Sequence, residues 1–108
     1  MEREYHLVDD LATTLGKIQP GDIVSRTIFK GDSLRVILFG IDVGEELSEH
    51  TASQAAIIQI IQGEATVAVG DDTHELKVGS WLQMPPRLKH SVYAKSSVVM
   101  LLTMYEAN

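Results

Sequence analysis

Short runs of apolar residues, separated by turn-forming residues, make up most of the chain from Asp22 onward. The run DIVSRTIFK leads through the turn GDS into LRVILFGIDV, and both runs are rich in the Val, Ile and Phe that favour strands. Further runs of the same kind follow: LSEHTA, AIIQIIQ, EATVAV, THELKV, WLQM, HSVYA and VVMLLTMY. Pro85 and Pro86 end the WLQM run, because neither proline can donate a hydrogen bond to a neighbouring strand. Short strands at regular spacing predict an all-β sandwich or barrel.

The start of the chain has a different pattern. Three leucines recur there at helical spacing: Leu7, Leu11 and Leu15. Asp9 or Asp10 could cap a short helix that Gly16 would end. We therefore expect residues 1–21 to form an arm or short helix that covers an open barrel end or reaches a partner subunit. Residues 22–108 are expected to form one barrel domain.

Composition and charge narrow the class of protein. With 108 residues, 44% of them apolar and 22% charged, the chain has the make-up of one soluble globular domain. The net charge of −6 argues against a nucleic-acid partner, and no apolar run is long enough to cross a membrane. The absence of cysteine excludes disulfides and thiolate metal sites. The acidic start, MEREYHLVDD, lacks the pattern of a signal peptide, so we expect a cytoplasmic protein.

Two of the four histidines, His50 and His90, fall within predicted strands. Side chains alternate between the two faces of a strand, so each of these histidines should share a face with small or apolar residues. The two expected faces are Ser48, His50 and Ala52 in LSEHTA, and His90, Val92 and Ala94 in HSVYA. Such faces are typical of a half-buried cavity wall. His6 and His74 lie in polar surroundings and are expected at the surface.

The spacing around these two histidines resembles the two sequence motifs of the cupin family. The first motif runs Gly, five residues, His-x-His, three or four residues, Glu, six residues, Gly; the second runs Gly, five residues, Pro-x-Gly, two residues, His, three residues, Asn. The matching positions are Gly44, His50 and Gly63 in the first motif, and Gly79, Pro85 and His90 in the second. The resemblance covers residues 44–94 and implies a double-stranded β-helix, the jelly-roll barrel of cupins.

Four motif positions depart from the family pattern: Ala52, Ala56, Arg87 and Ala94. In metal-binding cupins, the two first-motif histidines, the glutamate and the second-motif histidine hold one metal ion. This chain keeps His50 and His90, whereas alanines stand where the other two ligands would be. Two neutral imidazoles alone hold a divalent ion weakly.

A divalent transition metal such as Zn, Fe, Ni or Mn would need a further donor beside His50 and His90. Gln54 follows the first motif closely and is one candidate, although an amide oxygen is a poor ligand for a transition metal. A purely structural role is the alternative, in which both histidines are hydrogen-bonded residues of the barrel wall.

A ligand pocket is the third interpretation of the histidine pair. Ala52 and Ala56 would leave space beside the two imidazoles, and Met100 would add a flexible thioether to the wall. The expected pocket residues are therefore His50, His90, Ala52, Ala56 and Met100.

These residues favour a small-molecule-binding barrel as the leading functional hypothesis. Three alternatives stay open: a metal-assisted oxygenase or isomerase, a metal-free enzyme that uses His50 and His90 as acid and base, and a stand-alone ligand-sensing module.

An open barrel of this size leaves strand edges that must be covered. The run DIVSRTIFK is well placed to pair with its counterpart across a two-fold axis. We therefore expect a homodimer.

Overall fold

The computed structural model describes residues 4–106, and nine strands lie within that range. They are β1 (Ile23–Lys30), β2 (Leu34–Ile41), β3 (Glu46–His50), β4 (Ala55–Gln62), β5 (Glu64–Val69), β6 (Asp72–Lys77), β7 (Trp81–Met84), β8 (His90–Ala94) and β9 (Val98–Tyr105). Each strand corresponds to one of the apolar runs of the sequence, so the predicted all-β class is confirmed. The described residues contain no helix that could cross a membrane.

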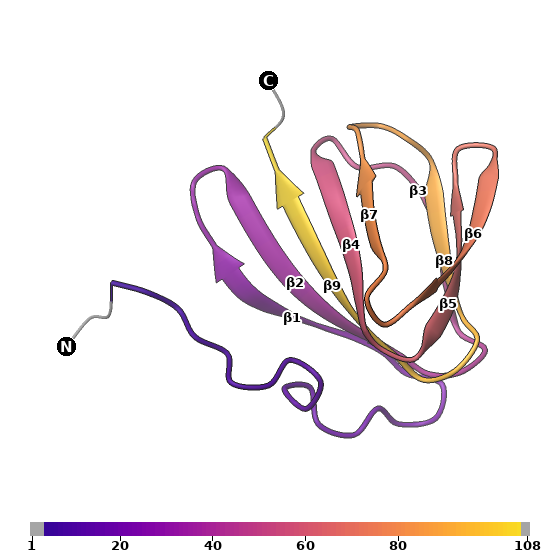
Figure 1. The fold of residues 1–108 in the computed structure, drawn as a ribbon, viewed down its shortest axis with the longest axis horizontal. Coiled ribbons are helices and arrows are strands. Elements are labelled where there is room, and N and C mark those ends of the chain that lie inside the picture. The colour runs from indigo at the N-terminus through magenta and orange to yellow at the C-terminus, as the bar shows by residue number, and fades with distance from the viewer. Residues whose placement is uncertain (1–3, 107–108) are drawn as a thin grey trace.

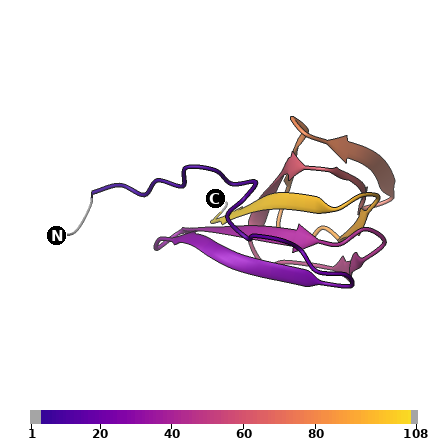
Figure 2. The ribbon, with the colours of Figure 1, turned by 90° about the horizontal axis from the view of Figure 1, so that it is seen from below.

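The strands form two antiparallel sheets that face each other across the core (Figure 1). The larger sheet has the strand order β1-β2-β9-β4-β7, and the smaller sheet has the order β3-β8-β5-β6. Most connections pass from one sheet to the other, which is the jelly-roll arrangement. Viewed from below, the N-terminal arm projects away from the barrel beside the β1–β2 hairpin (Figure 2).

Four turns meet at the upper end of the barrel in Figure 1, which we call the upper rim. They consist of residues 31–33, 51–54, 70–71 and 85–89. Two of these turns flank the histidines singled out in the sequence, because β3 ends at His50 and β8 begins at His90. The fold therefore brings both histidines to the same end of the molecule.

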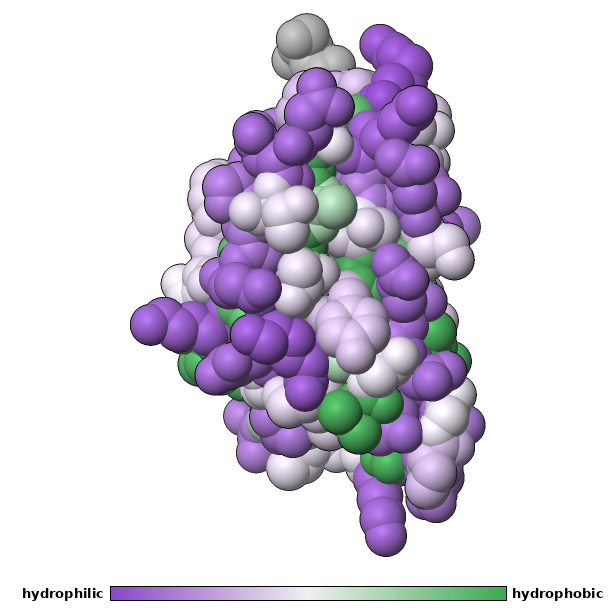
Figure 3. Space-filling view, turned by 90° about the vertical axis from the view of Figure 1, so that its right-hand side faces the viewer, coloured by the Kyte–Doolittle hydropathy of each residue, from purple (hydrophilic) through white to green (hydrophobic). Residues whose placement is uncertain are grey.

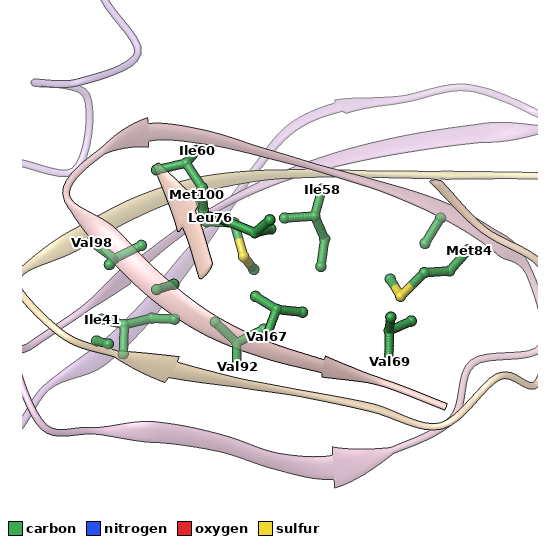
Figure 4. Close-up of a cluster of buried hydrophobic side chains, with 13 residues drawn as sticks. Ile41, Ile58, Ile60, Val67, Val69, Leu76, Met84, Val92, Val98 and Met100 are labelled. Atoms are coloured by element: carbon green, nitrogen blue, oxygen red, sulfur yellow. The ribbon is translucent and has the colours of Figure 1, made fainter. Parts of the chain in front are cut away.

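Apolar side chains fill the space between the two sheets, as Figure 4 shows. The cluster includes Ile41, Ile58, Ile60, Val67, Val92, Val98 and Met100. Full burial of such a side chain contributes roughly 1.5–3 kcal/mol, so this core stabilises the barrel. Gly63, with φ +83°, joins β4 to β5 at the lower end, where a side chain would collide with the carbonyl oxygen of Ser97.

The outer faces of the two sheets differ in polarity. The smaller sheet presents a mostly hydrophilic surface (Figure 3), which includes the hydrogen-bonded pair Thr66 and Glu75. The larger sheet presents apolar residues on its outer face; Leu38, for example, pairs with Leu101 and is fully buried. The arm covers part of this face, because its own apolar side chains lie against Gly40 of β2.

The N-terminal segment forms an arm without a helix, so the alternative of a short helix was wrong. Residues 11–15 form a turn in which Ala12 N donates to Asp10 Oδ1 at 2.9 Å and Thr14 Oγ1 donates to the Asp10 carbonyl at 2.6 Å. Gly16 then adopts φ +69°. Because the aspartate satisfies these groups locally and Gly16 reverses the chain, no further helical turn forms.

Candidate functional site

His50 and His90 lie side by side on neighbouring strands of the smaller sheet. Their Cα atoms are direct partners in the β3–β8 pairing, and their ring centroids are 4.2 Å apart with an interplanar angle of 64°. His50 is exposed, whereas His90 has an exposed fraction of 7%. The structure thus brings together two imidazoles that are forty residues apart in the sequence.

A bulge in β3 sets the direction of His50. Leu47 pairs with Val92 and His50 pairs with His90. Between these two pairs the chain advances by three residues in β3 but by only two in β8, so β3 contains one extra residue, a β-bulge. As a result Leu47 and His50 both line the barrel interior. Strict alternation had predicted that these two side chains lie on opposite faces, which was wrong. In β8, by contrast, His90, Val92 and Ala94 are all buried, as alternation predicted.

Both imidazoles are oriented by the backbone in the same way. His50 Nδ1 lies 2.6 Å from the Ser48 carbonyl oxygen, and His90 Nδ1 lies 3.0 Å from the Leu88 carbonyl oxygen. A carbonyl oxygen can only accept a hydrogen bond, so each Nδ1 carries a proton, and in the neutral ring each Nε2 has a free lone pair. Within residues 4–106 neither Nε2 has a protein partner.

Burial favours the neutral form of His90. Desolvation is the largest influence and lowers the pKa of His90 from its ordinary value of 6.5, and the neighbouring His50 lowers this pKa further. The hydrogen bond to the Leu88 carbonyl raises the pKa and offsets part of this effect. Near neutral pH the His90 imidazole is therefore an acceptor, available to a hydrogen-bond donor or a metal ion.

A small cavity of about 30 Å³ separates the two histidines from the core. Its lining residues are Phe39, Leu47, His50, Ile58, His90, Val92, Met100 and Leu102. One water needs roughly 10–15 Å³, so this cavity has room for an ion or for one or two waters. Pockets that enclose organic ligands measure roughly 300–1,000 Å³, far more than this.

The predicted pocket residues are only partly assembled at this cavity. His50, His90 and Met100 line it, whereas Ala52 and Ala56 do not. Ala56 is part of the apolar core, and Ala52 lies in the turn after β3. Larger apolar residues, such as Phe39 and Ile58, line the cavity in place of the two alanines.

Gln54, the candidate third metal donor, lies elsewhere. Its side-chain Nε2 donates to Glu106 Oε1 at 3.4 Å, which ties it to the residue after β9. Within residues 4–106 no group of three or more His, Asp, Glu or Cys side chains could hold a metal ion.

The β7–β8 loop carries a strained residue beside the histidines. Arg87 has φ +67°, and it is the one non-glycine residue with a positive φ among residues 4–106. Its backbone N donates to the Ala52 carbonyl at 2.7 Å, which joins the turn that follows His50 to the loop that precedes His90. Arg87 stands where the second cupin motif has glycine, the residue that adopts a positive φ without strain. The motif position therefore indicated the backbone conformation of Arg87.

Five apolar lining residues were not among those predicted from the sequence. They are Phe39, Leu47, Ile58, Val92 and Leu102. Alternation marks most of them as inward-facing, but only the pairing register shows that they lie level with the histidines.

Comparison with known families settles the fold family. The family model of the cupin domain matches residues 37–105, which is more than half of the chain. The chain belongs to the cupin family. The β-barrel that the motif spacing implied is thereby confirmed, together with the jelly-roll arrangement of its strands.

Solved structures give the same fold over almost the entire length of this cupin. A conserved protein of unknown function from Streptococcus pyogenes is 27% identical, with a TM-score of 0.83 over 100% of this chain and 92% of that chain. A cupin superfamily protein from Desulfitobacterium hafniense is 22% identical, with a TM-score of 0.83 over 99% of this chain and 95% of that chain. KdgF from Halomonas sp. is 20% identical, with a TM-score of 0.73 over 85% of this chain and 86% of that chain. Comparison with curated proteins gives no match.

The donor set of this cupin does not fit the divalent metal site of the metal-binding members. That site takes three histidines and a carboxylate, and here Ala52 and Ala56 supply neither the third imidazole nor the carboxylate. Gln54 points to Glu106 and does not replace them. Two imidazoles with no carboxylate leave the charge of a divalent ion without a counter-charge.

Proposed function

We propose that this cupin is a binding protein whose site is the His50–His90 pair. The observation that carries the proposal is the pair of free Nε2 lone pairs, each held in a fixed tautomer by a backbone carbonyl, beside one small cavity. Two acceptors at one point recognise a group that offers hydrogen bonds or positive charge. The expected ligand group is therefore a hydroxyl, an amide N–H, an ammonium or a metal ion.

The size of the cavity supports a ligand that inserts only a small group. About 30 Å³ admits one or two heavy atoms beside His90, while His50 is exposed near the upper rim. The remainder of a larger ligand would stay at the rim, beside the turns 51–54 and 85–89. This arrangement favours binding at the barrel end over enclosure of an organic molecule in the interior.

Binding fits the surroundings of the histidines better than metal-free acid–base catalysis does. A catalytic imidazole that becomes charged is usually stabilised by a carboxylate on its other nitrogen. Here both Nδ1 atoms donate to backbone carbonyls, which orient the rings without adding a negative charge. Burial of His90 also disfavours its protonated form.

A titration with two matched probes tests the proposal. Acetamide offers N–H donors, whereas N,N-dimethylacetamide has the same carbonyl without them. Acetamide should shift the ring-proton NMR signals of both histidines in one saturable step, and its dimethyl counterpart should not. The acetamide response should be lost in His50→Ala. Equal responses to both probes, or a response in the variant, would contradict the proposal.

We also propose that the barrel works as a homodimer. β1 lies at the edge of the larger sheet and has a strand partner on one side only, and its eight residues make it a long edge. The outer face of the same sheet carries apolar residues that stay partly exposed, Leu101 among them, and Trp81 at its β7 edge is 60% exposed. A second copy that covers this face and edge would bury them both.

A further inference from the structure

A crevice lies between the N-terminal arm and the lower end of the barrel, far from the histidine pair at the upper rim. Its volume is about 330 Å³, which falls within the roughly 300–1,000 Å³ of pockets that hold small organic molecules. The arm forms one wall, and the end of β4, the β8–β9 turn and the start of β9 form the other. The lining residues are Ala12, Thr13, Gly16, Lys17, Ile18, Gln62, Ser97 and Val99.

A bulge at the end of β4 places Gln62 in this crevice. Ile60 pairs with Met100 and Gln62 pairs with Val99, so between the two pairs β4 advances by two residues and β9 by only one. Strict alternation would point Gln62 into the core, together with Ile58 and Ile60. The extra residue instead puts Gln62 on the outer face of the larger sheet, beside Val99, where both residues line the crevice.

The arm is held against the barrel close to this crevice. Side-chain carbons of Leu15 and Ile18 lie so near Gly40 of β2 that a Cβ atom there would meet them at 2.9–3.0 Å. Glycine therefore permits the close approach of the arm. Nη1 of Arg26 also donates to the Thr14 carbonyl at 3.3 Å. Because residues of the arm form one wall, the crevice exists only while the arm is docked in this position.

The residues of the crevice suit an anion with an apolar part. Although the chain has a net charge of −6, Lys17 is the one charged residue that lines the crevice, and it forms no ion pair with another residue of the range 4–106. The hydroxyls of Thr13 and Ser97 and the amide of Gln62 add hydrogen-bond donors to the wall. Val99, with an exposed fraction of 2%, adds an apolar surface. One positive charge with donors and hydrocarbon favours a singly charged carboxylate.

We propose that this crevice binds a small organic monocarboxylate, whose carboxylate lies beside Lys17 and whose hydrocarbon part lies against Ile18 and Val99. The inference goes beyond the binding role proposed for the histidine pair and does not depend on it. Because the ligand would contact the arm and the barrel together, it binds the docked arm in preference to an undocked one. The carboxylate therefore clamps the arm onto the barrel.

A titration of ¹⁵N-labelled protein with butyrate tests the site. Butyrate should shift the amide NMR signals of Lys17, Gln62 and Ser97 in one saturable step. 2-Pentanone has the same shape, with a methyl group in place of the charged oxygen, and should not saturate these shifts over the same concentration range. Acetate should bind more weakly than butyrate, because each buried CH₂ group strengthens binding by up to about fourfold.

Two pairs of matched variants assign the residues. Lys17→Gln should weaken butyrate binding about fivefold, which is the upper end of what one exposed ion pair contributes. Lys30→Gln removes the same charge from the end of β1 at the upper rim and should bind butyrate as the parent does. Gln62→Leu keeps a side chain of similar size without the amide and should also lose about fivefold. Gln59→Leu, on the same strand but outside the crevice, should lose nothing.

Limited digestion of the parent protein with trypsin tests the clamp, because trypsin cleaves after Lys17. Cleavage there should slow about tenfold at a butyrate concentration ten times the dissociation constant, and 2-pentanone at that concentration should not slow it. An unchanged cleavage rate would overturn the clamp.

Three results of the titration would overturn the carboxylate site. They are the absence of a saturable shift with butyrate, shifts confined to the ring protons of His50 and His90, and equal binding of butyrate and 2-pentanone. Equal losses in Lys17→Gln and Lys30→Gln would show an effect of net charge alone and would overturn the assignment of Lys17. The acetamide titration of the histidine pair is unaffected by any of these results.

Discussion

Removal of the Ile58 side chain down to alanine should both destabilise the barrel and rehydrate His90. Ile58 has an exposed fraction of 1%, belongs to the core cluster and lines the histidine cavity. Its strand is hydrogen-bonded on both sides, where Ile58 pairs with Leu82 of β7 and Leu102 of β9. The backbone therefore has little freedom to close the new space.

The expected loss lies in the upper half of the range for large-to-small core substitutions. Such changes cost about 2–5 kcal/mol, and the cost is greatest where the surroundings cannot collapse. We expect a loss near 4 kcal/mol for Ile58→Ala, which is a large part of the roughly 5–15 kcal/mol that stabilises a domain. With a urea m-value near 2 kcal/mol/M, the unfolding midpoint should fall by about 2 M.

The same change should raise the pKa of His90 toward its ordinary value. Desolvation is the largest cause of the lowered pKa, and a larger cavity that connects to the exposed His50 would admit water beside His90. The assays are urea unfolding and an NMR titration of the His90 ring protons in metal-free protein. Ile57→Ala is the matched control, because Ile57 precedes Ile58 and faces the other side of the sheet. A loss below about 1 kcal/mol, or the same His90 pKa in Ile58→Ala as in the control, would refute the reasoning.

Three further predictions concern the loop, the pH dependence and the assembly. Arg87→Gly should stabilise the protein by up to about 1 kcal/mol in thermal unfolding, because glycine adopts φ +67° without strain; a lower melting temperature would show that the arginine side chain contributes more than its backbone strain costs. The pKa of His90 is lower in the folded protein than its ordinary 6.5, so the unfolded chain takes up the proton first; the unfolding free energy of metal-free protein should fall as the pH drops below 6.5, and less steeply in His90→Gln. Light scattering should give twice the chain mass of 11.9 kDa, and Leu101→Lys should give one chain mass; a parent of 11.9 kDa would remove the dimer proposal.

The strands and the family could be predicted from the sequence because both depend on local patterns. Alternating apolar runs and glycine or proline turns locate every strand to within a few residues, and the spacing of Gly44, His50, Gly79, Pro85 and His90 indicates the cupin barrel. The two histidines at one barrel end follow from that topology, since β3 ends and β8 begins there.

Details that depend on packing could not be predicted in the same way. The bulge between Leu47 and His50 brings both side chains to the same face of β3, whereas strict alternation would put them on opposite faces. No residue of LSEHTA indicates this bulge in the sequence. The helical spacing of leucines at the start of the chain proved compatible with a turn, because the Asp10 side chain and backbone satisfy the local hydrogen bonds. The size of the cavity depends on side chains from both sheets, so the space expected beside Ala52 and Ala56 could not be judged from those two alanines.

The claim on which the binding site depends is that two imidazoles meet with both Nδ1–H groups held by backbone carbonyls and both Nε2 atoms free of protein partners. Long-range ¹H–¹⁵N correlation NMR of metal-free protein near neutral pH measures it directly. We predict protonated Nδ1 and unprotonated Nε2 in both His50 and His90, together with a nuclear Overhauser effect between the two rings, whose centroids are 4.2 Å apart. Protonation at Nε2 of either ring, or no Overhauser effect between them, would contradict the account.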